Sequence, residues 1–215
     1  KLTFKATNLD GQPVSVEGNY KLYPVVGGAK SEEVMKGTPA YTGTFVSNKE
    51  TLLPGWTSVP SGEYLLVMSA KDDQGREVTG EEEVILFSIK DKRPPVDKAI
   101  WYYAENTSFD AAHPAVFYFG TSKKDAYVMM NLFSGNRMLE SKVLRLSDSI
   151  ERFEYPYKES YGNGLSATFC FVKDGSVNQQ TVRMTKRLPD KTLTMKWEVF
   201  RDKLRPGQEE EWKLT

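Results

Sequence analysis

Short apolar runs separated by tight turns follow one another closely through the second half of the chain. Turn sequences such as Asn163–Gly164 and Asp174–Gly175 lie between the runs, and such pairs favour hairpin turns. About seven short strands in about 100 residues is typical of an antiparallel β-sandwich. The predicted strands are Pro114–Phe119, Ala126–Phe133, Met138–Leu146, Ile150–Tyr157, Leu165–Val172, Thr181–Lys186 and Leu193–Phe200.

The first half of the chain shows the same pattern less regularly. Val14–Tyr23 is predicted to be a strand. Gly62–Lys71 (GEYLLVMSAK) is almost entirely apolar, which predicts a strand buried on both faces, and Val84–Ile89 is expected to be its partner. The segment between Val14–Tyr23 and Gly62–Lys71 is richer in Gly, Pro, Ser and Thr. Within it, Phe45 and Trp56 are expected to anchor the core.

A proline-rich segment divides the two halves. Lys90–Asp97 (KDKRPPVD) contains the pair Pro94–Pro95, which has no amide hydrogen to donate to a sheet and stiffens the chain. No dozen-residue window carries an apolar helical stripe with caps, and no strand–helix alternation indicates a parallel sheet. The sequence therefore predicts an all-β protein of two antiparallel immunoglobulin-like sandwiches in tandem, spanning residues 1–92 and 98–203, with 93–97 as the linker.

The last residues of the chain look like the start of another unit. Lys203–Glu209 contains a Pro-Gly turn signal, and Glu211–Thr215 reads as the beginning of a strand. Because an independent domain rarely ends on an opening strand, we expect this chain to be a segment of a longer modular protein, with 204–215 beginning the next module.

Composition narrows the possible partners. Lys and Arg together number 29, as do Asp and Glu, so no excess positive charge indicates a nucleic-acid partner. No apolar run approaches the ~20 residues of a membrane span. The single cysteine excludes an internal disulfide, which fits a reducing compartment and equally a periplasmic protein without bridges.

The chain has one cysteine and one histidine as candidate reactive groups. Cys170 lies between Phe169 and Phe171, so strand alternation places its side chain on the opposite face, and we expect a buried, inert thiol. His113, the sole histidine, precedes Pro114 at a loop boundary and is expected on the surface. A Ser-His-Asp arrangement stays open, although no nucleophile-elbow motif supports it.

Acidic residues and glycines give no stronger site. The acidic runs are Glu81–Glu83 and Glu209–Glu211. Because neighbouring strand residues point to opposite faces, three in a row cannot converge on one cation. Each run is therefore expected to solubilise an exposed strand. Asp72–Asp73 is expected in a turn. Val26–Ala29 lacks the Lys-Ser/Thr ending of a phosphate-binding loop. We therefore assign no catalytic, cofactor-binding or metal-binding residue, and expect no cofactor and no enzymatic activity.

Two aromatic-rich stretches, Ile100–Tyr103 and Phe153–Tyr161, allow two interpretations. Exposed aromatic side chains stack on sugars or grip a peptide, whereas Tyr155 and Tyr157 share a strand face with Phe153, which favours core or inter-domain packing. We expect packing.

Several motifs resemble, as a set, those of macroglobulin domains. Asn8–Val14 (NLDGQPV) is similar to the opening of such a domain, and Gly62–Tyr64 with Lys71–Gly75 is similar to a later strand and turn. The most specific stretch is Met195–Gly207 (MKWEVFRDKLRPG), continuing to Glu210–Trp212. It resembles a module junction in bacterial alpha-2-macroglobulin-like proteins, particularly those of the Bacteroides group.

The resemblance implies a string of macroglobulin sandwiches in a periplasmic or cell-surface protein that traps proteases, with a lipid anchor as one option before Lys1. The family's thioester needs Cys-x-Glu-Gln, but Phe171, Val172 and Lys173 follow Cys170. No bait segment is recognisable either. The resemblance thus implies a non-catalytic scaffold, whose partners are neighbouring domains of the parent chain and, through the full-length protein, proteases.

Two other functions compete with this hypothesis. A cell-surface adhesin or carbohydrate-binding module would present an exposed flat row of Trp101, Tyr102, Tyr155 or Tyr157. A hydrolase would need titratable groups clustered in a cleft around His113 or the acidic turns.

Overall fold

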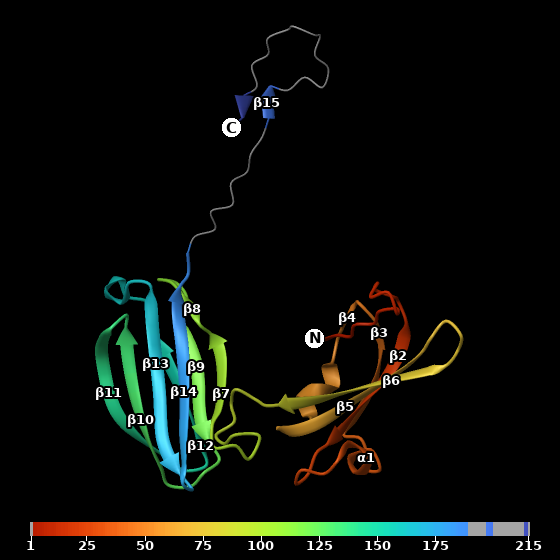
Figure 1. Ribbon diagram of the computed structural model, residues 1–215, viewed down its shortest axis with the longest axis horizontal. Helices are drawn as coiled ribbons and strands as arrows, with labels where there is room; N and C mark the ends of the chain where they lie inside the picture. The colour runs from red at the N-terminus through yellow and green to blue at the C-terminus, as the bar shows by residue number, and fades with distance from the viewer. Residues whose placement is uncertain (1, 189–196, 200–212, 215) are drawn as a thin grey trace.

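The chain folds as two antiparallel immunoglobulin-like β-sandwiches in tandem, which confirms the predicted fold class. This computed structural model describes residues 2–188, 197–199 and 213–214. The sandwiches lie side by side, and the chain passes from one to the other between Leu86 and Trp101 (Figure 1). In the described part, no helix is both long and apolar enough to cross a membrane.

The first sandwich combines a four-stranded sheet, in the order β3-β2-β5-β6, with a small two-stranded sheet, β1-β4. The helical turns α1 and η1 lie in the connections between strands. The elements are β1 (Leu2–Thr3), β2 (Glu17–Pro24), α1 (Ser31–Val34), β3 (Tyr41–Val46), β4 (Glu50–Thr51), η1 (Pro54–Ser58), β5 (Gly62–Lys71) and β6 (Glu77–Leu86).

The core of the first sandwich is aromatic. Phe4 stacks on Phe45 with ring centroids 4.3 Å apart, and Tyr20 packs edge-on against Trp56 at 6.2 Å. Phe45 is buried, and Trp56 packs against the buried cluster. Both predicted anchors are therefore confirmed.

Strand β5 is buried on both faces along its first half, as its composition predicts. Tyr64 and Leu66 face the aromatic core, whereas Leu65 lies in a second cluster with Tyr23 and Val34. Val34 belongs to α1, which lies between β2 and β3 in the chain and near one end of the four-stranded sheet (Figure 1), so this segment covers Leu65 on the sheet's outer side. A strand covered on both sides needs no polar residues in alternation.

The second sandwich packs a five-stranded sheet, β11-β10-β13-β14-β8, against a three-stranded sheet, β12-β9-β7. All pairings are antiparallel except that of β14 with β8, which is parallel. The elements are β7 (Trp101–Asn106), β8 (Ser108–Phe109), β9 (Ala115–Thr121), β10 (Ala126–Ser134), β11 (Arg137–Leu146), β12 (Ser149–Tyr155), η2 (Glu159–Tyr161), β13 (Gly164–Lys173) and β14 (Ser176–Lys186).

Interlocked phenylalanines join the two sheets of the second sandwich. Phe119 stacks on Phe169 of the opposite sheet with centroids 4.1 Å apart, and Phe117 packs edge-on against the same ring at 6.1 Å. The order β11-β10-β13-β14 repeats that of β3-β2-β5-β6 in the first sandwich. The two modules thus share a four-stranded sheet built from two hairpins.

Strand boundaries differ from the predictions at several places. β6 begins at Glu77 rather than Val84, because Glu81–Glu83 lie within the strand with all three side chains exposed. The predicted strand Leu193–Phe200 was counted with the second sandwich, but its described part, β15 (Trp197–Val199), pairs with β16 (Lys213–Leu214). The second sandwich instead contains β7, which pairs with β9 and lies in an aromatic-rich stretch for which the sequence predicts no strand. The Pro-Gly turn and the Glu209–Glu211 run lie outside the described residues.

Candidate functional site at the junction of the two sandwiches

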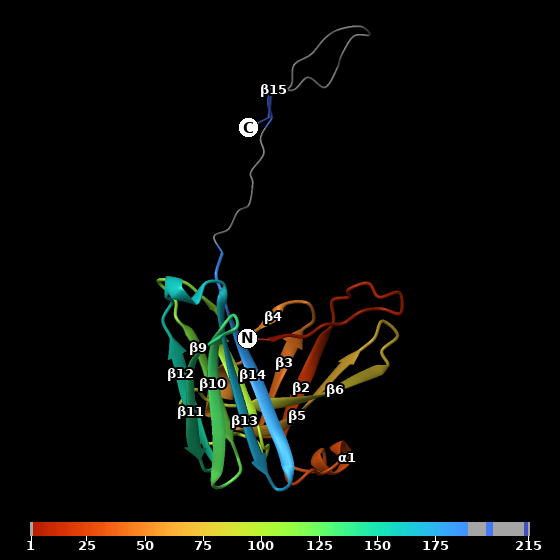
Figure 2. The same cartoon turned by 60° about the vertical axis from the view of Figure 1, so that its left-hand side comes forward.

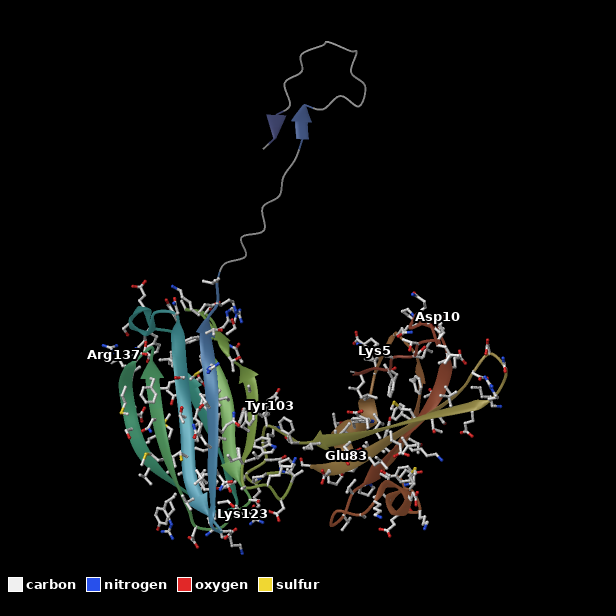
Figure 3. The ribbon with its side chains drawn as sticks, viewed as in Figure 1. Lys5, Asp10, Glu83, Tyr103, Lys123 and Arg137 are labelled. Atoms are coloured by element: carbon white, nitrogen blue, oxygen red, sulfur yellow. The ribbon has the colours of Figure 1, made fainter. Side chains whose placement is uncertain are left out.

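The outer face of the three-stranded sheet is aromatic and is covered by the segment that connects the two sandwiches. Trp101, Val116 and Tyr118 are buried there, with Tyr103 and Ile150 packed against them. Every residue of β9 is consequently buried, on the outer face as well as the inner one. Figure 3 shows Tyr103 on the side of the second sandwich that faces the first.

The covering residues come from the connecting segment. Phe87 follows the last residue of β6 and packs edge-on against Trp101, with centroids 5.3 Å apart, and against Tyr103 at 4.6 Å. Val96, from the predicted linker, is buried in the same cluster. Desolvated aromatic contacts of this kind stabilise an inter-domain contact beyond their buried area.

Hydrogen bonds hold the linker on the second sandwich. Ile150 N–H donates to the carbonyl of Lys92 at 2.9 Å, and Ser122 Oγ donates to Asp97 Oδ1 at 2.6 Å. The pKa of Asp97 is lowered, first by that hydroxyl and then by the charge of Lys123. The linker therefore lies along the second sandwich instead of crossing open solvent.

The start of the connection is also fixed. Asp91 Oδ2 accepts hydrogen bonds from Ser61 Oγ at 2.6 Å and from Ser88 N–H at 2.8 Å. Ser61 immediately precedes β5, so Asp91 ties the connection back to the first sandwich. Neither the serines nor the aspartate gave a signal in the sequence, because these contacts join segments far apart in the chain.

The aromatic stretches are used mainly for packing, as expected. Trp101 is buried, and Tyr155 stacks on Phe117 with centroids 6.2 Å apart. Burial is the main cause that raises the pKa of the Tyr155 phenol. Tyr157 packs edge-on against Phe109. Tyr102 alone of the four predicted ligand-stacking residues is exposed, so the flat row that an adhesin or carbohydrate module would present does not form.

Cys170 corrects one prediction. Its neighbours Phe169 and Phe171 are buried, so the predicted alternation is confirmed, but the thiol is only partly buried. It lies on the outer face of the five-stranded sheet, between Met129 and Gln179 on the adjacent strands. The prediction of a buried thiol was wrong because alternation fixes which face a residue takes, not whether another element covers that face.

His113 lies on the surface, as predicted. Its Nδ1 is 2.9 Å from Asp110 Oδ1, and this hydrogen bond is the main cause that lowers the pKa of Asp110. Arg187 Nη1 lies 3.6 Å from the second oxygen of Asp110. The described contacts of His113 include no serine hydroxyl, so no Ser-His-Asp arrangement is seen among them. The cluster thus links the turn after β8 to the residue that follows β14.

The acidic positions also have structural roles in the described part. Asp72 accepts hydrogen bonds from the backbone N–H groups of Gln74 and Arg76, at 2.9 and 2.8 Å, which closes the β5–β6 turn as predicted. Glu81–Glu83 lie on β6, an edge strand, where charges oppose pairing with another sheet. Within the described ranges, no three His, Cys, Asp or Glu side chains gather into a possible metal site.

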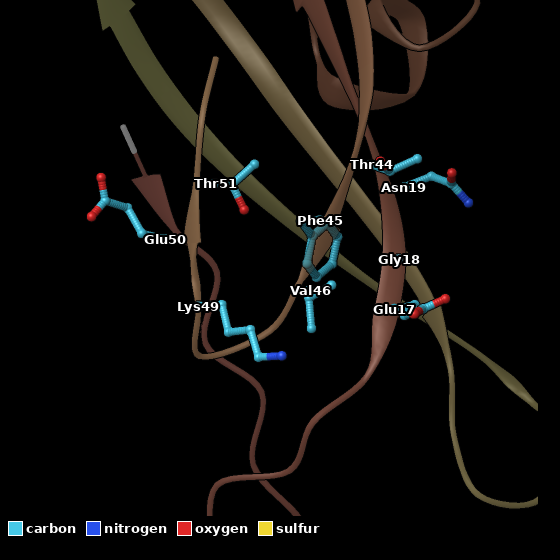
Figure 4. Close-up of a pocket in the computed structure, with 9 residues that line it drawn as sticks. All are labelled: Glu17, Gly18, Asn19, Thr44, Phe45, Val46, Lys49, Glu50 and Thr51. Atoms are coloured by element: carbon cyan, nitrogen blue, oxygen red, sulfur yellow. The ribbon is translucent and has the colours of Figure 1, made fainter.

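An open groove of about 570 Å³ lies beside β3 in the first sandwich (Figure 4). Phe45, Val46, Lys49 and Thr51 are among its lining residues, which come from β2, from β3 and from the turn into β4. No histidine or cysteine belongs to this lining. Its volume suits a small ligand, but its side chains do not converge on one point in Figure 4, and we assign no chemistry to it.

Comparison with known proteins identifies no family. No family model matches the chain, and no curated protein matches it. Among solved structures, a crystal structure of a tetra-tandem repeat in the extending region of a large adhesion protein is 12% identical, with a TM-score of 0.31. The match covers 86% of this chain and 45% of that chain. A likeness at this TM-score carries no argument about fold or function.

Proposed function

We propose that this chain is a non-catalytic scaffold segment of a bacterial alpha-2-macroglobulin-like protease inhibitor. The observation that supports a scaffold role is the junction, where Phe87, Val96 and Trp101 form one apolar cluster. Two sandwiches joined in this way keep a defined spacing and orientation. The inhibitor itself is inferred from the resemblance of Met195–Gly207 to a module junction of that family.

A scaffold role requires that movement of one module be passed to the next. A module on a free linker reorients without displacing its neighbour, because nothing couples the two. Here the connecting segment is anchored on both sides, by Asp91 to Ser61 and by the carbonyl of Lys92 to Ile150. A rearrangement elsewhere in the parent protein would therefore move both sandwiches together.

The experiment is a protease assay with the full-length protein encoded by the parent gene. A trapped protease is enclosed but still active, so we expect hydrolysis of a large protein substrate to fall while hydrolysis of a small peptide substrate continues. This chain alone is the control, and it should leave both rates unchanged because it carries no bait or thioester. If the full-length protein leaves hydrolysis of the large substrate as fast as with the protease alone, the inhibitor proposal is refuted.

A further inference from the structure

The outer face of the five-stranded sheet presents an exposed apolar surface. Tyr127 and Met129 on β10, Val143 on β11, Val172 on β13 and Val177 on β14 are each more than half exposed. The strand neighbours of Tyr127 and Met129 on β10, and Phe171 beside Val172 on β13, point inward and are buried in the core. We call the surface formed by these five side chains the outer apolar face.

Strand register makes this surface continuous. Met129 lies opposite Val143 on one side and opposite Cys170 on the other, and Val172 lies opposite Val177. Directly opposed side chains on a sheet are about 5 Å apart, close enough to touch. β10, β13 and β14 are seen side by side in Figures 1 and 2. Single exposed apolar residues are ordinary, whereas a contiguous patch indicates an interaction site.

Few charged residues border this surface. Neutral residues such as Asn131, Thr168 and Thr181 continue the face between the apolar rows. Among its described β10–β14 positions, the charged ones are Arg145, opposite Tyr127, and Arg183, opposite Ser166. Arg145 is already paired with Asp125, just before β10, at 3.0 Å. A complementary surface would be apolar in the centre, with a carboxylate placed near Arg183.

The first sandwich shows how a corresponding face is covered. Its four-stranded sheet has the same strand order, and its outer residue Leu65 is buried beneath Val34 of α1. The covering segment is the long connection between β2 and β3. In the second sandwich the corresponding connection, between β10 and β11, is only Gly135–Asn136. So short a turn cannot fold back over the sheet, and the face stays open.

The size of the surface favours a neighbouring module over a second copy. The whole outer side of this sheet, apolar and neutral rows together, spans four strands about 4.8 Å apart and about 20 Å of strand length, a footprint of roughly 400 Å². Two copies face to face would bury about 800 Å², less than the 1,200–2,000 Å² of a stable complex. Contacts between domains of one chain need only about 600–1,500 Å².

We propose that a neighbouring module of the same polypeptide docks on the outer apolar face, through an apolar surface with a carboxylate placed to pair with Arg183. This inference rests on the proposed function in so far as it requires a longer modular protein. The other sheet of the second sandwich is already covered in this way, by Phe87 and Val96 of the preceding segment. The second sandwich would then be held between two neighbours, one on each sheet.

Cys170 provides the test, because it is the single cysteine of the chain and lies within the face. Its rate of reaction with N-ethylmaleimide would be measured by peptide mass mapping, in this chain and in the full-length protein. A covered thiol reacts only when the covering module opens. We expect the rate to be at least about tenfold lower in the full-length protein.

A charge substitution tests whether the outer apolar face is the surface that slows the labelling of Cys170. Val172→Glu in the full-length protein should restore fast labelling of Cys170, since it places a carboxylate within the contact. Val78→Glu on β6 is the matched control, because Val78 is also more than half exposed but lies outside the face, and it should leave labelling slow. Melting temperatures of both variants in this chain should match that of the unsubstituted chain, which shows that each still folds.

Three results would overturn the inference. Equal labelling rates in the two proteins would show an uncovered face. Labelling that slows with increasing concentration of this chain, together with dimers in sedimentation, would assign the face to a second copy. A reading frame without a further module would remove the proposed occupant. The protease assay is independent: slow labelling without protease inhibition would uphold docking and refute only the inhibitor.

Discussion

Phe87→Ala tests whether the junction couples the two sandwiches. Phe87 makes two edge-on aromatic contacts, with Trp101 and Tyr103, and each such pair contributes about 0.5–1.5 kcal/mol. The ring is partly buried, and full burial of a Phe side chain contributes about 1.5–3 kcal/mol, so roughly half of that is added. Truncation should weaken the junction by about 2–4 kcal/mol.

The assay has two readouts. Urea unfolding followed by circular dichroism should show a lower midpoint, with the two sandwiches unfolding in separate steps. Small-angle X-ray scattering should show a larger and more variable separation of the modules. Both follow because Phe87 packs in the junction cluster rather than in either main core.

Ile89→Ala is the matched control for this variant. Ile89 is two residues further along the same segment but is more than half exposed, and such surface changes usually stay within about 0.5 kcal/mol. If Phe87→Ala and Ile89→Ala behave alike in unfolding and in scattering, the aromatic cluster does not hold the modules together, and the scaffold argument fails.

Two further predictions concern the individual sandwiches. Gly164→Ala should destabilise the second sandwich by at least about 1–3 kcal/mol. Gly164 has φ +147°, and an added Cβ would lie 2.1 Å from a carbonyl oxygen of β14. In a thermal melt, Gly80→Ala should lower the melting temperature less, because its Cβ meets only a flexible methionine side chain at 3.4 Å. Asp72 has a lowered pKa, chiefly because the backbone N–H of Arg76 donates to its carboxylate. A carboxyl with a lowered folded-state pKa stabilises the protein above its unfolded-state pKa, and this stability is lost as pH falls through the folded-state value. Urea midpoints measured from pH 6 to pH 2 should therefore fall less steeply for Asp72→Asn than for Asp73→Asn, and parallel curves would contradict the assigned role.

The sequence predicted much of the local structure because strand patterns and turns depend on neighbouring residues. Gly62–Lys71 was predicted with the same bounds as β5, and the burial of its first half on both faces followed from its mostly apolar composition. Asp72 was predicted in a turn because its side chain bonds to backbone only two and four residues away. The acidic run on β6 hid the start of that strand, because charges on an exposed edge break the usual alternation.

Burial depended on contacts that the sequence does not show. Alternation placed Cys170 opposite Phe169 and Phe171, but whether that face is covered depends on a separate element. Trp101 and Tyr102 are adjacent aromatic residues, yet one is buried and the other exposed. Trp101 is covered by Phe87, which belongs to the other half of the chain.

The sequence by itself determined that this protein is all-β and where most of its strands and turns lie, because these follow from the preferences of adjacent residues. Only the tertiary structure decided that the linker is held against the second sandwich and which sheet faces are covered. Those outcomes depend on hydrogen bonds and apolar contacts between distant segments, such as Lys92 with Ile150, for which no local pattern exists.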